Sequence, residues 1–98
     1  MSEYRRWRVT GGTFFFTIVT HQRRRLFDDA SLRHFLRESL IDVKRRRPFQ
    51  IPAMVLLPDH LHMIMQLPEK DLDYSVRIRQ IKSLFTRRLA ATHETQQG

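Results

Sequence analysis

The sequence predicts an α+β domain in which an antiparallel sheet carries two helices on one face. Three observations lead to this fold class. The chain has 98 residues, of which 41% are apolar, so it can build one small core but not two. Its apolar residues fall into three short runs of strand length and two segments with helical spacing. These segments follow one another in the order β-α-β-β-α.

The first predicted strand covers residues 13–20, where the run TFFFTIVT is aromatic and β-branched. Its uninterrupted apolar character predicts a central strand that is covered on both faces. A helix follows, capped by Asp28 or Asp29, in which apolar residues recur every three or four positions. This helix is expected to end before Pro48, because proline disfavours helical geometry in the residue that precedes it.

Two further strands are predicted from residue 51 onward, where the sequence reads IPAMVLLPDHLHMIMQLP. The segment holds two apolar runs of strand length. Pro58 and Asp59 separate them and mark a turn. We therefore expect two tightly linked strands.

A second helix is predicted after the acidic stretch that begins at Glu69, with Asp73 or Ser75 as its cap. Its apolar positions recur at helical spacing up to Leu89. Residues 90–98 are polar and show no periodicity, so they predict a flexible tail. The expected domain thus spans residues 1–89.

This order supplies five of the six elements of a ferredoxin-like β-α-β-β-α-β domain, and the last strand is missing from the pattern. In that topology the final strand lies beside the first. Residues 13–20 are therefore expected to form an open sheet edge, which recruits a partner strand or invites aggregation. This predicts a homodimer through the first strand, or in the extreme case a fragment that folds only by such pairing.

The charge of the chain points to an anionic partner. Lys and Arg number 18 against 10 Asp and Glu, which gives a net charge of +8, and 15 of the 18 cations are arginine. Six arginines stand in residues 1–25 against the single acid Glu3. A guanidinium offers a planar fork to phosphate and can also stack on a base, so nucleic acid is the expected partner. The alternative is a solvated surface that binds nothing.

Several classes of protein are excluded by composition. The absence of cysteine removes a disulfide framework, a zinc ribbon, an iron–sulfur site and a thiol nucleophile. No stretch approaches the roughly 18 apolar residues that span a bilayer, and the start MSEYRRWR lacks the apolar run of a secretion signal. We therefore expect a cytoplasmic protein that contacts no membrane.

His60 and His62 form the most informative motif. They lie in a predicted strand, where alternate side chains share a face, with Cα atoms roughly 6.5–7 Å apart. Two imidazoles so placed can converge on one divalent ion. Two ligands are too few for a closed structural zinc site, which leaves an open site suited to phosphodiester chemistry. Asp59, Gln66 or another polar side chain would complete the ligand set, and otherwise each histidine merely bonds a backbone group or water.

The segment LPDHLHMI at residues 57–64 resembles the signature of the HUH single-strand DNA transposases, in which a His-hydrophobic-His strand follows a Pro-Asp or Pro-Glu turn. The segments SEYRRWRVTGGTFFFT, KRRRPFQI, LPEKDLDYS and IRQIKSLFTRRL resemble the REP-associated tyrosine transposases, where REP denotes a repetitive extragenic palindrome. The resemblance covers residues 2–89. It implies that His60 and His62 are ligands of Mg²⁺ or Mn²⁺.

The resemblance also implies an activity. Such proteins recognise single-stranded or hairpin DNA and nick and rejoin it: a tyrosine hydroxyl attacks the phosphate, becomes joined to the 5′ side and releases a 3′ hydroxyl. The family's tyrosine helix and last strand have no counterpart in this chain, whose tyrosines are Tyr4 and Tyr74. Tyr74 falls at the start of the second helix, where packing or capping is expected rather than catalysis. The chain is thus expected to be an incomplete family member that is inactive alone.

Candidate DNA contacts come from two regions. The N-terminal segment resembles the family's DNA-binding segment, and its two glycines, which form a flexible turn, would let backbone amides approach phosphate. Cations on the second helix supply the other group. The candidates are Arg5, Arg6, Arg8, Gly11, Gly12, Arg79, Lys82, Arg87 and Arg88.

A second hypothesis places the chain in a different class: a non-enzymatic nucleic-acid-binding module whose histidines are structural. The resemblance favours the transposase and implies a bacterial, nucleoid-associated protein. Selective response of His60 and His62 to Mn²⁺ would separate the two hypotheses.

Overall fold

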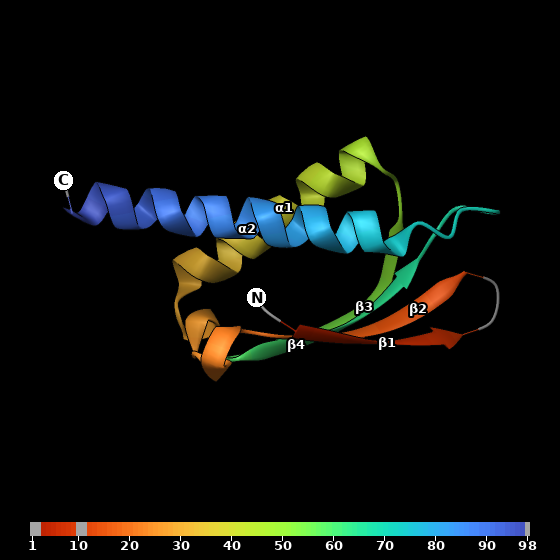
Figure 1. The fold of residues 1–98 in the computed structure, drawn as a ribbon, viewed down its shortest axis with the longest axis horizontal. Helices are drawn as coiled ribbons and strands as arrows, with labels where there is room; N and C mark the ends of the chain where they lie inside the picture. The colour runs from red at the N-terminus through yellow and green to blue at the C-terminus, as the bar shows by residue number, and fades with distance from the viewer. Residues whose placement is uncertain (1–2, 10–11, 98) are drawn as a thin grey trace.

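Four antiparallel strands form the sheet, in the order β1-β2-β4-β3 (Figure 1). The computed structural model describes the backbone of residues 3–9 and 12–97 and the side chains of residues 12–91. The strands are β1 (Glu3–Val9), β2 (Thr13–Val19), β3 (Gln50–Leu57) and β4 (His60–Gln66). Two helices, α1 (Ala30–Arg46) and α2 (Tyr74–Gln97), lie side by side over one face of the sheet. This confirms the predicted α+β sheet with two helices on one face.

Strand β1 is the element that sequence reasoning did not predict. It pairs with β2 along its whole length, from Glu3 opposite Val19 to Val9 opposite Thr13. It takes the position beside β2 that the last strand of the ferredoxin-like order would fill. The expected open edge at residues 13–20 is therefore wrong: β2 is paired with β1 on one side and with β4 on the other. The predicted homodimer through that strand has no free edge to use.

The turn between β1 and β2 depends on Gly12, whose φ is +81°, a conformation that side chains disfavour. The Gly12 carbonyl accepts a hydrogen bond from the backbone N–H of Leu67 at 3.2 Å. The glycine thus ties the hairpin to the segment that leaves β4.

Both helices begin at predicted caps. The Asp29 carboxylate accepts the backbone N–H of Ser31 at 2.7 Å, and that of Asp73 accepts the N–H of Val76 at 3.4 Å. Helix α1 ends at Arg46, two residues before Pro48, as predicted.

Helix α2 runs past its predicted end. Its backbone stays helical to Gln97, where a flexible tail from residue 90 was expected. Residues 90–97 contain no glycine or proline and several good helix formers, so the helix can propagate from the packed turns before them. Loss of apolar periodicity after Leu89 therefore did not mark the end of the helix.

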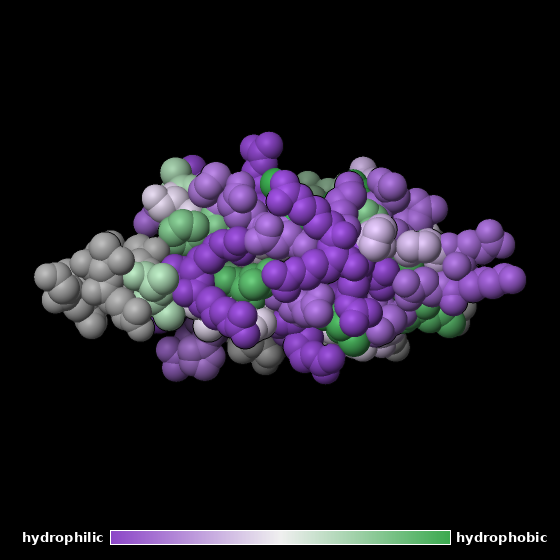
Figure 2. All heavy atoms as spheres, turned by 90° about the horizontal axis from the view of Figure 1, so that it is seen from above, coloured by the Kyte–Doolittle hydropathy of each residue, from purple (hydrophilic) through white to green (hydrophobic). Residues whose placement is uncertain are grey.

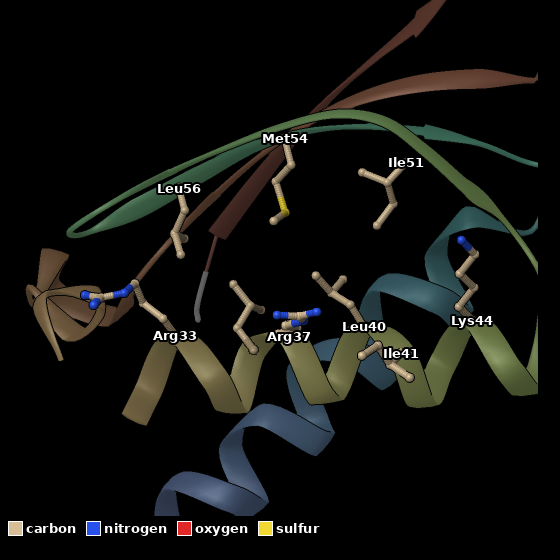
Figure 3. Close-up of a pocket in the computed structure, with 9 residues that line it drawn as sticks. Arg33, Arg37, Leu40, Ile41, Lys44, Ile51, Met54 and Leu56 are labelled. Carbon is tan, nitrogen blue, oxygen red and sulfur yellow. The ribbon is translucent and has the colours of Figure 1, made fainter. Parts of the chain in front are cut away.

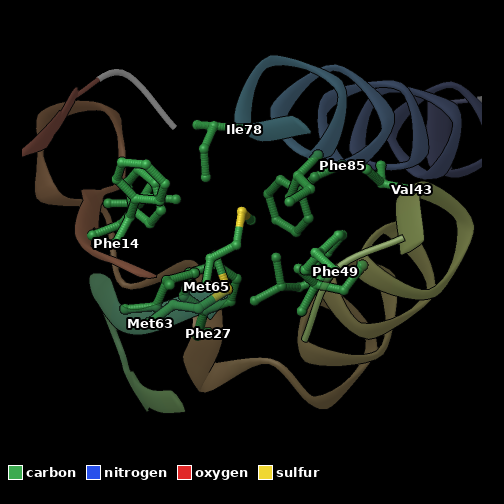
Figure 4. Packing of buried hydrophobic residues seen from close by; sticks show 14 of the residues in the cluster. Phe14, Phe27, Val43, Phe49, Met63, Met65, Ile78 and Phe85 are labelled. Atoms are coloured by element: carbon green, nitrogen blue, oxygen red, sulfur yellow. The ribbon is translucent and has the colours of Figure 1, made fainter. Parts of the chain in front are cut away.

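The core fills the space between the sheet and the helices. Phe16 and Met65 come from the strands, and Phe85 comes from α2; all three side chains are at most 1% exposed (Figure 4). Burial alternates along β2 and β4, so only alternate side chains enter the core. The expected cover on both faces of β2 is therefore wrong. Its apolar run is explained by a core on one face and a half-buried, partly aromatic face on the other.

Buried Arg77 joins the segment that precedes α2 to the residues that follow α1. Its guanidinium donates to the Asp71 carboxylate at 2.9 and 3.3 Å, and to the carbonyls of Arg47, Pro48 and Asp73 at 2.8–3.2 Å. The residue is 2% exposed. A planar group with five donors can satisfy all of these acceptors at once, which a lysine cannot do.

Candidate metal centre

His60 and His62 lie on the face of the sheet that α1 and α2 leave uncovered. Their neighbours on β4, Leu61 and Met63, are 1% exposed and point into the core. The two imidazole rings stand edge to face, with centroids 4.9 Å apart and planes at 82°. The predicted arrangement of two histidines on one side of a strand is present.

One nitrogen of His60 is held by a carboxylate. Its Nδ1 lies 2.7 Å from Asp59 Oδ1, and the second oxygen of Asp59 accepts a hydrogen bond from Arg23 Nε at 3.2 Å. The bond with His60 is the main cause that lowers the pKa of Asp59 below its usual value, and Arg23 adds to it. With Nδ1–H committed to Asp59, the neutral ring presents Nε2 as its lone-pair nitrogen.

The corresponding nitrogen of His62 is held by a hydroxyl. Its Nδ1 lies 3.0 Å from Thr17 Oγ1 on β2, and Thr17 stands opposite His62 in the register. The His62 ring stacks on Phe15, with centroids 5.8 Å apart and planes at 18°. The two contacts together fix the ring, and Nε2 has no hydrogen-bond partner among the side chains of residues 12–91.

A third ligand is not found within the part of the chain that the structure describes, where no group of three His, Cys, Asp or Glu side chains could hold a metal ion. Asp59 is engaged by His60 and Arg23. Gln66 stands four residues beyond His62 on β4, about 13 Å along the strand. Among the described residues, the candidate site thus consists of His60 and His62 alone.

Tyr74 lies on the opposite side of the sheet from the histidines. Its ring packs on Phe14 and Phe16, with centroids 4.9 and 5.9 Å away, and both phenylalanines belong to the core face of β2. The packing role expected for Tyr74 agrees with this position. Tyr4 stands opposite Ile18 in the register of β1, and its side chain lies outside the described residues.

The cations predicted on α2 belong to the helix layer and not to the histidine face. Hydrophilic side chains cover that layer, as seen from above in Figure 2. Arg79 and Arg87 are exposed, and partial burial lowers the pKa of Lys82. Arg88 is engaged by Ser39 Oγ at 2.7 Å and by the Asp42 carboxylate, so it ties α2 to α1. The structure therefore does not bring these cations together with His60 and His62.

The N-terminal candidates are placed only in part. Gly12 is buried at the end of the sheet away from His60, since Thr13 stands opposite Gln66. Arg5 stands opposite Thr17, the register neighbour of His62. The side chains of Arg5, Arg6 and Arg8, and Gly11 as a whole, lie outside the described residues. The assignment of all these residues to DNA stays a prediction.

A groove of about 340 Å³ lies between α1 and β3 (Figure 3). Its β3 side is formed by residues such as Met54 and Leu56, which stand opposite the core residues Met63 and Leu61. Val55 and Leu57, opposite His62 and His60, alternate to the other face. The groove and the metal centre are thus on different faces of the sheet.

Three contacts at this centre were missed by sequence reasoning. Thr17 and Arg23 are 45 and 36 residues from the side chains they bond, so only the strand register brings them there. Asp59 was one of several polar side chains considered as a further ligand, beside Gln66, and in the structure its carboxylate bonds His60 and Arg23. The one available signal was its position next to His60 at a turn.

The chain was compared with known proteins. The family model described as "Transposase IS200 like" matches residues 9–98. The chain belongs to the IS200-like transposase family. No helix among the described residues of this family member combines the length and the apolar character needed to cross a membrane.

Two curated relatives of this chain are named as transposases. The chain is 50% identical over 86 residues to the REP-associated tyrosine transposase of Escherichia coli strain K12, a match that covers 88% of this chain and 52% of the relative. It is 42% identical over 89 residues to a putative REP-associated tyrosine transposase of Haemophilus influenzae, covering 91% of this chain and 50% of that protein. The chain spans about half the length of the curated relatives it matches.

A solved structure has the same fold. It is described as a REP-associated tyrosine transposase bound to a REP hairpin, and it matches with a TM-score of 0.74 and 47% sequence identity. The match covers 92% of this IS200-like chain and 54% of the solved chain. The fold and the family predicted from the sequence are confirmed.

Proposed function

We propose that this chain binds REP-type hairpin or single-stranded DNA and presents a divalent cation to it at His60 and His62. The observation that carries the proposal is the pair of imidazoles on the uncovered sheet face, each with Nδ1 engaged and with no partner for Nε2 among the side chains of residues 12–91. Relatives that match over this segment are transposases, and one solved relative is bound to a REP hairpin.

His60 and His62 would hold the ion between them. Their rings stand on one face of the sheet, with centroids 4.9 Å apart. Mg²⁺ or Mn²⁺ held there would neutralise charge at a phosphodiester and orient it for attack.

The contribution of the protein to this chemistry is to position the two imidazole rings. Asp59 holds the proton of His60 at Nδ1, and Thr17 holds the ring of His62 against β2. The face around the histidines also carries partly exposed Phe15 and Ile64, which are suited to contact with bases. The net charge of +8 supplies the long-range attraction for a polynucleotide.

The nucleophile of the proposed reaction is a tyrosine, as the family resemblance implies. Tyr74 lies across the sheet from the histidine pair, packed on Phe14, so it is not placed to attack a phosphate there. The side chain of Tyr4 lies outside the described residues, and nothing in the sequence corresponds to the tyrosine helix that the resemblance implies. We therefore propose that these 98 residues bind DNA but form no covalent link to it on their own.

The experiment is a salt series of binding to a fluorescent REP-type hairpin, followed by a denaturing gel. We expect log affinity to fall linearly with log salt, by about 0.9 per phosphate contact. We also expect no protein–DNA adduct in Mn²⁺. A matched oligonucleotide of scrambled, unpaired sequence is the control. Failure to bind the hairpin, or a covalent product that maps to Tyr74, would contradict the proposal.

A further inference from the structure

A basic loop leaves the sheet at the histidine end. Val19, the last residue of β2, stands opposite His60, and residues 20–25 continue from it into the short helical turns before α1 (Figure 1, orange). The side chains of residues 21–25 are all exposed. They read HQRRR, so four of the five can carry positive charge.

The loop is fixed to the turn that precedes the histidines. The backbone N–H of Thr20 donates to the Asp59 carbonyl at 2.9 Å, and the Thr20 hydroxyl contacts the same carbonyl at 3.0 Å and that of Arg24 at 2.6 Å. The N–H of Phe27 donates to the Pro58 carbonyl at 2.9 Å. The loop therefore cannot shift relative to His60 without breaking several hydrogen bonds.

The backbone of the loop is strained. Gln22 and Arg23 have φ values of 55° and 52°, in the left-handed region that side chains disfavour. Such strain persists only where the surroundings enforce it, and it concentrates at functional sites. Here the strained bend carries Arg23 to Asp59, the carboxylate that orients His60.

Some cations of the loop are paired with a carboxylate and others are not, within the described side chains. Arg23 is paired with Asp59, and Arg25 with Asp28 at 2.8 Å. Arg24 and His21 have no acidic partner within ion-pair distance among the side chains of residues 12–91. Within residues 12–91, a fixed loop thus presents Arg24 and His21 as donors that no acidic side chain engages.

We propose that residues 21–25 form a phosphate-binding loop, in which Arg24 and His21 take a phosphodiester of single-stranded DNA next to the one held at the histidine pair. The proposal rests on the proposed function, because DNA at His60 and His62 is its premise. A guanidinium is matched to phosphate in shape and charge. The loop would align the strand that enters or leaves the metal centre.

The test compares two probes: a REP-type hairpin, and the same hairpin with a single-stranded extension of about six nucleotides, in the size range of one single-strand site. Arg24→Gln should weaken binding of the extended probe by about three- to tenfold and lower its salt slope by about 0.7, the value for one single-strand phosphate contact. Binding of the plain hairpin should stay unchanged. Arg24→Lys should recover part of the loss.

The control is Arg45→Gln, an exposed arginine near the end of α1 that should leave both probes unaffected. Equal losses on both probes, an equal effect of Arg45→Gln, or no effect of Arg24→Gln would overturn the loop proposal while leaving the proposed function in place. Failure of the unmodified protein to bind either probe would instead remove the proposed function. Unchanged melting temperatures establish that each variant is folded.

Discussion

Arg77 is a single buried cation whose hydrogen bonds stabilise several segments of this small domain. It bonds one carboxylate and three carbonyls that belong to different segments, and it is almost fully buried. Removal would leave buried acceptors without donors, which is among the costliest changes a core can suffer. The segments at residues 47–48 and 71–73 are therefore both held in place by the Arg77 side chain.

We predict that Arg77→Ala lowers the free energy of unfolding by about 3 kcal/mol or more. For a domain of this size such a loss lowers the melting temperature by roughly 12–24 °C. Thermal unfolding followed by circular dichroism measures it. The matched control is Arg79→Ala, an exposed residue two positions further along α2, which should change stability by less than about 0.5 kcal/mol. Similar effects of the two variants would contradict the structural role of Arg77.

Thr17 is predicted to act through His62. Thr17→Val keeps the β-branched shape but removes the hydroxyl that holds Nδ1. Loss of such a support typically lowers metal affinity by about 10- to 100-fold. Titration with Mn²⁺, followed by electron paramagnetic resonance of the free ion, measures this affinity.

The control for Thr17 is Thr13→Val, on the same face of the same strand but opposite Gln66. It should bind Mn²⁺ like the unmodified protein. If Thr17→Val also leaves the affinity unchanged, the hydroxyl plays no part in orienting the ring.

At the residue scale, the sequence predicted that His60 and His62 share one face of a strand, but not which side chains hold the two rings. The alternation of a strand places His60 and His62 on one face whatever the partner strands do. Thr17 required the register between β2 and β4, which no local pattern encodes. The burial of Arg77 was not predicted, because a charged residue is usually exposed to solvent. In the structure Arg77 belongs to a buried stripe of α2 at positions 77, 81 and 85.

At the scale of elements, α1 and α2 are joined by an ion pair as well as by the core. Arg88 contacts the Asp42 carboxylate, and this hydrogen bond is the main cause that lowers the pKa of Asp42. A carboxyl whose pKa is depressed on folding stabilises the fold above its unfolded pKa. That contribution is lost as the pH falls through the folded value.

We predict that Asp42→Asn is less stable than the unmodified protein at pH 7, and that the difference shrinks as the pH falls below about 4. Urea unfolding at pH 7 and pH 3 measures both. Glu38→Gln on the same helix is the control, since its nearest cationic neighbour is His34 at 3.8 Å and it should behave nearly alike at both values. A stability difference for Asp42→Asn that is independent of pH would contradict the assignment.

Strand β1 explains why element prediction fell short. Its sequence, EYRRWRV, is rich in arginine and lacks the apolar run that marked the other strands. An edge strand needs backbone hydrogen bonds to its neighbour more than buried side chains, so its pairing with β2 left no apolar signature. Helix α2 shows the complementary case, in which a helix continues beyond the last apolar position of its periodic pattern.

At the scale of the whole molecule, the sheet separates two surfaces with different chemistry. The helix layer carries Arg79, Lys82 and Arg87, while the uncovered face carries the histidines and aromatic side chains. A polynucleotide that reaches His60 and His62 lies against the sheet and the loop at its end. This separation follows from the topology of the sheet and helices. The distribution of charged residues along the sequence did not predict it.

The most direct test of the metal centre is a Mn²⁺ titration followed by the ring signals of the five histidines in NMR spectra. We expect the signals of His60 and His62 to broaden first and together, while those of His21, His34 and His93 persist. Equal broadening of all five rings, or none at either histidine of the pair, would rule out a metal ion shared by His60 and His62 and leave these residues with a structural role.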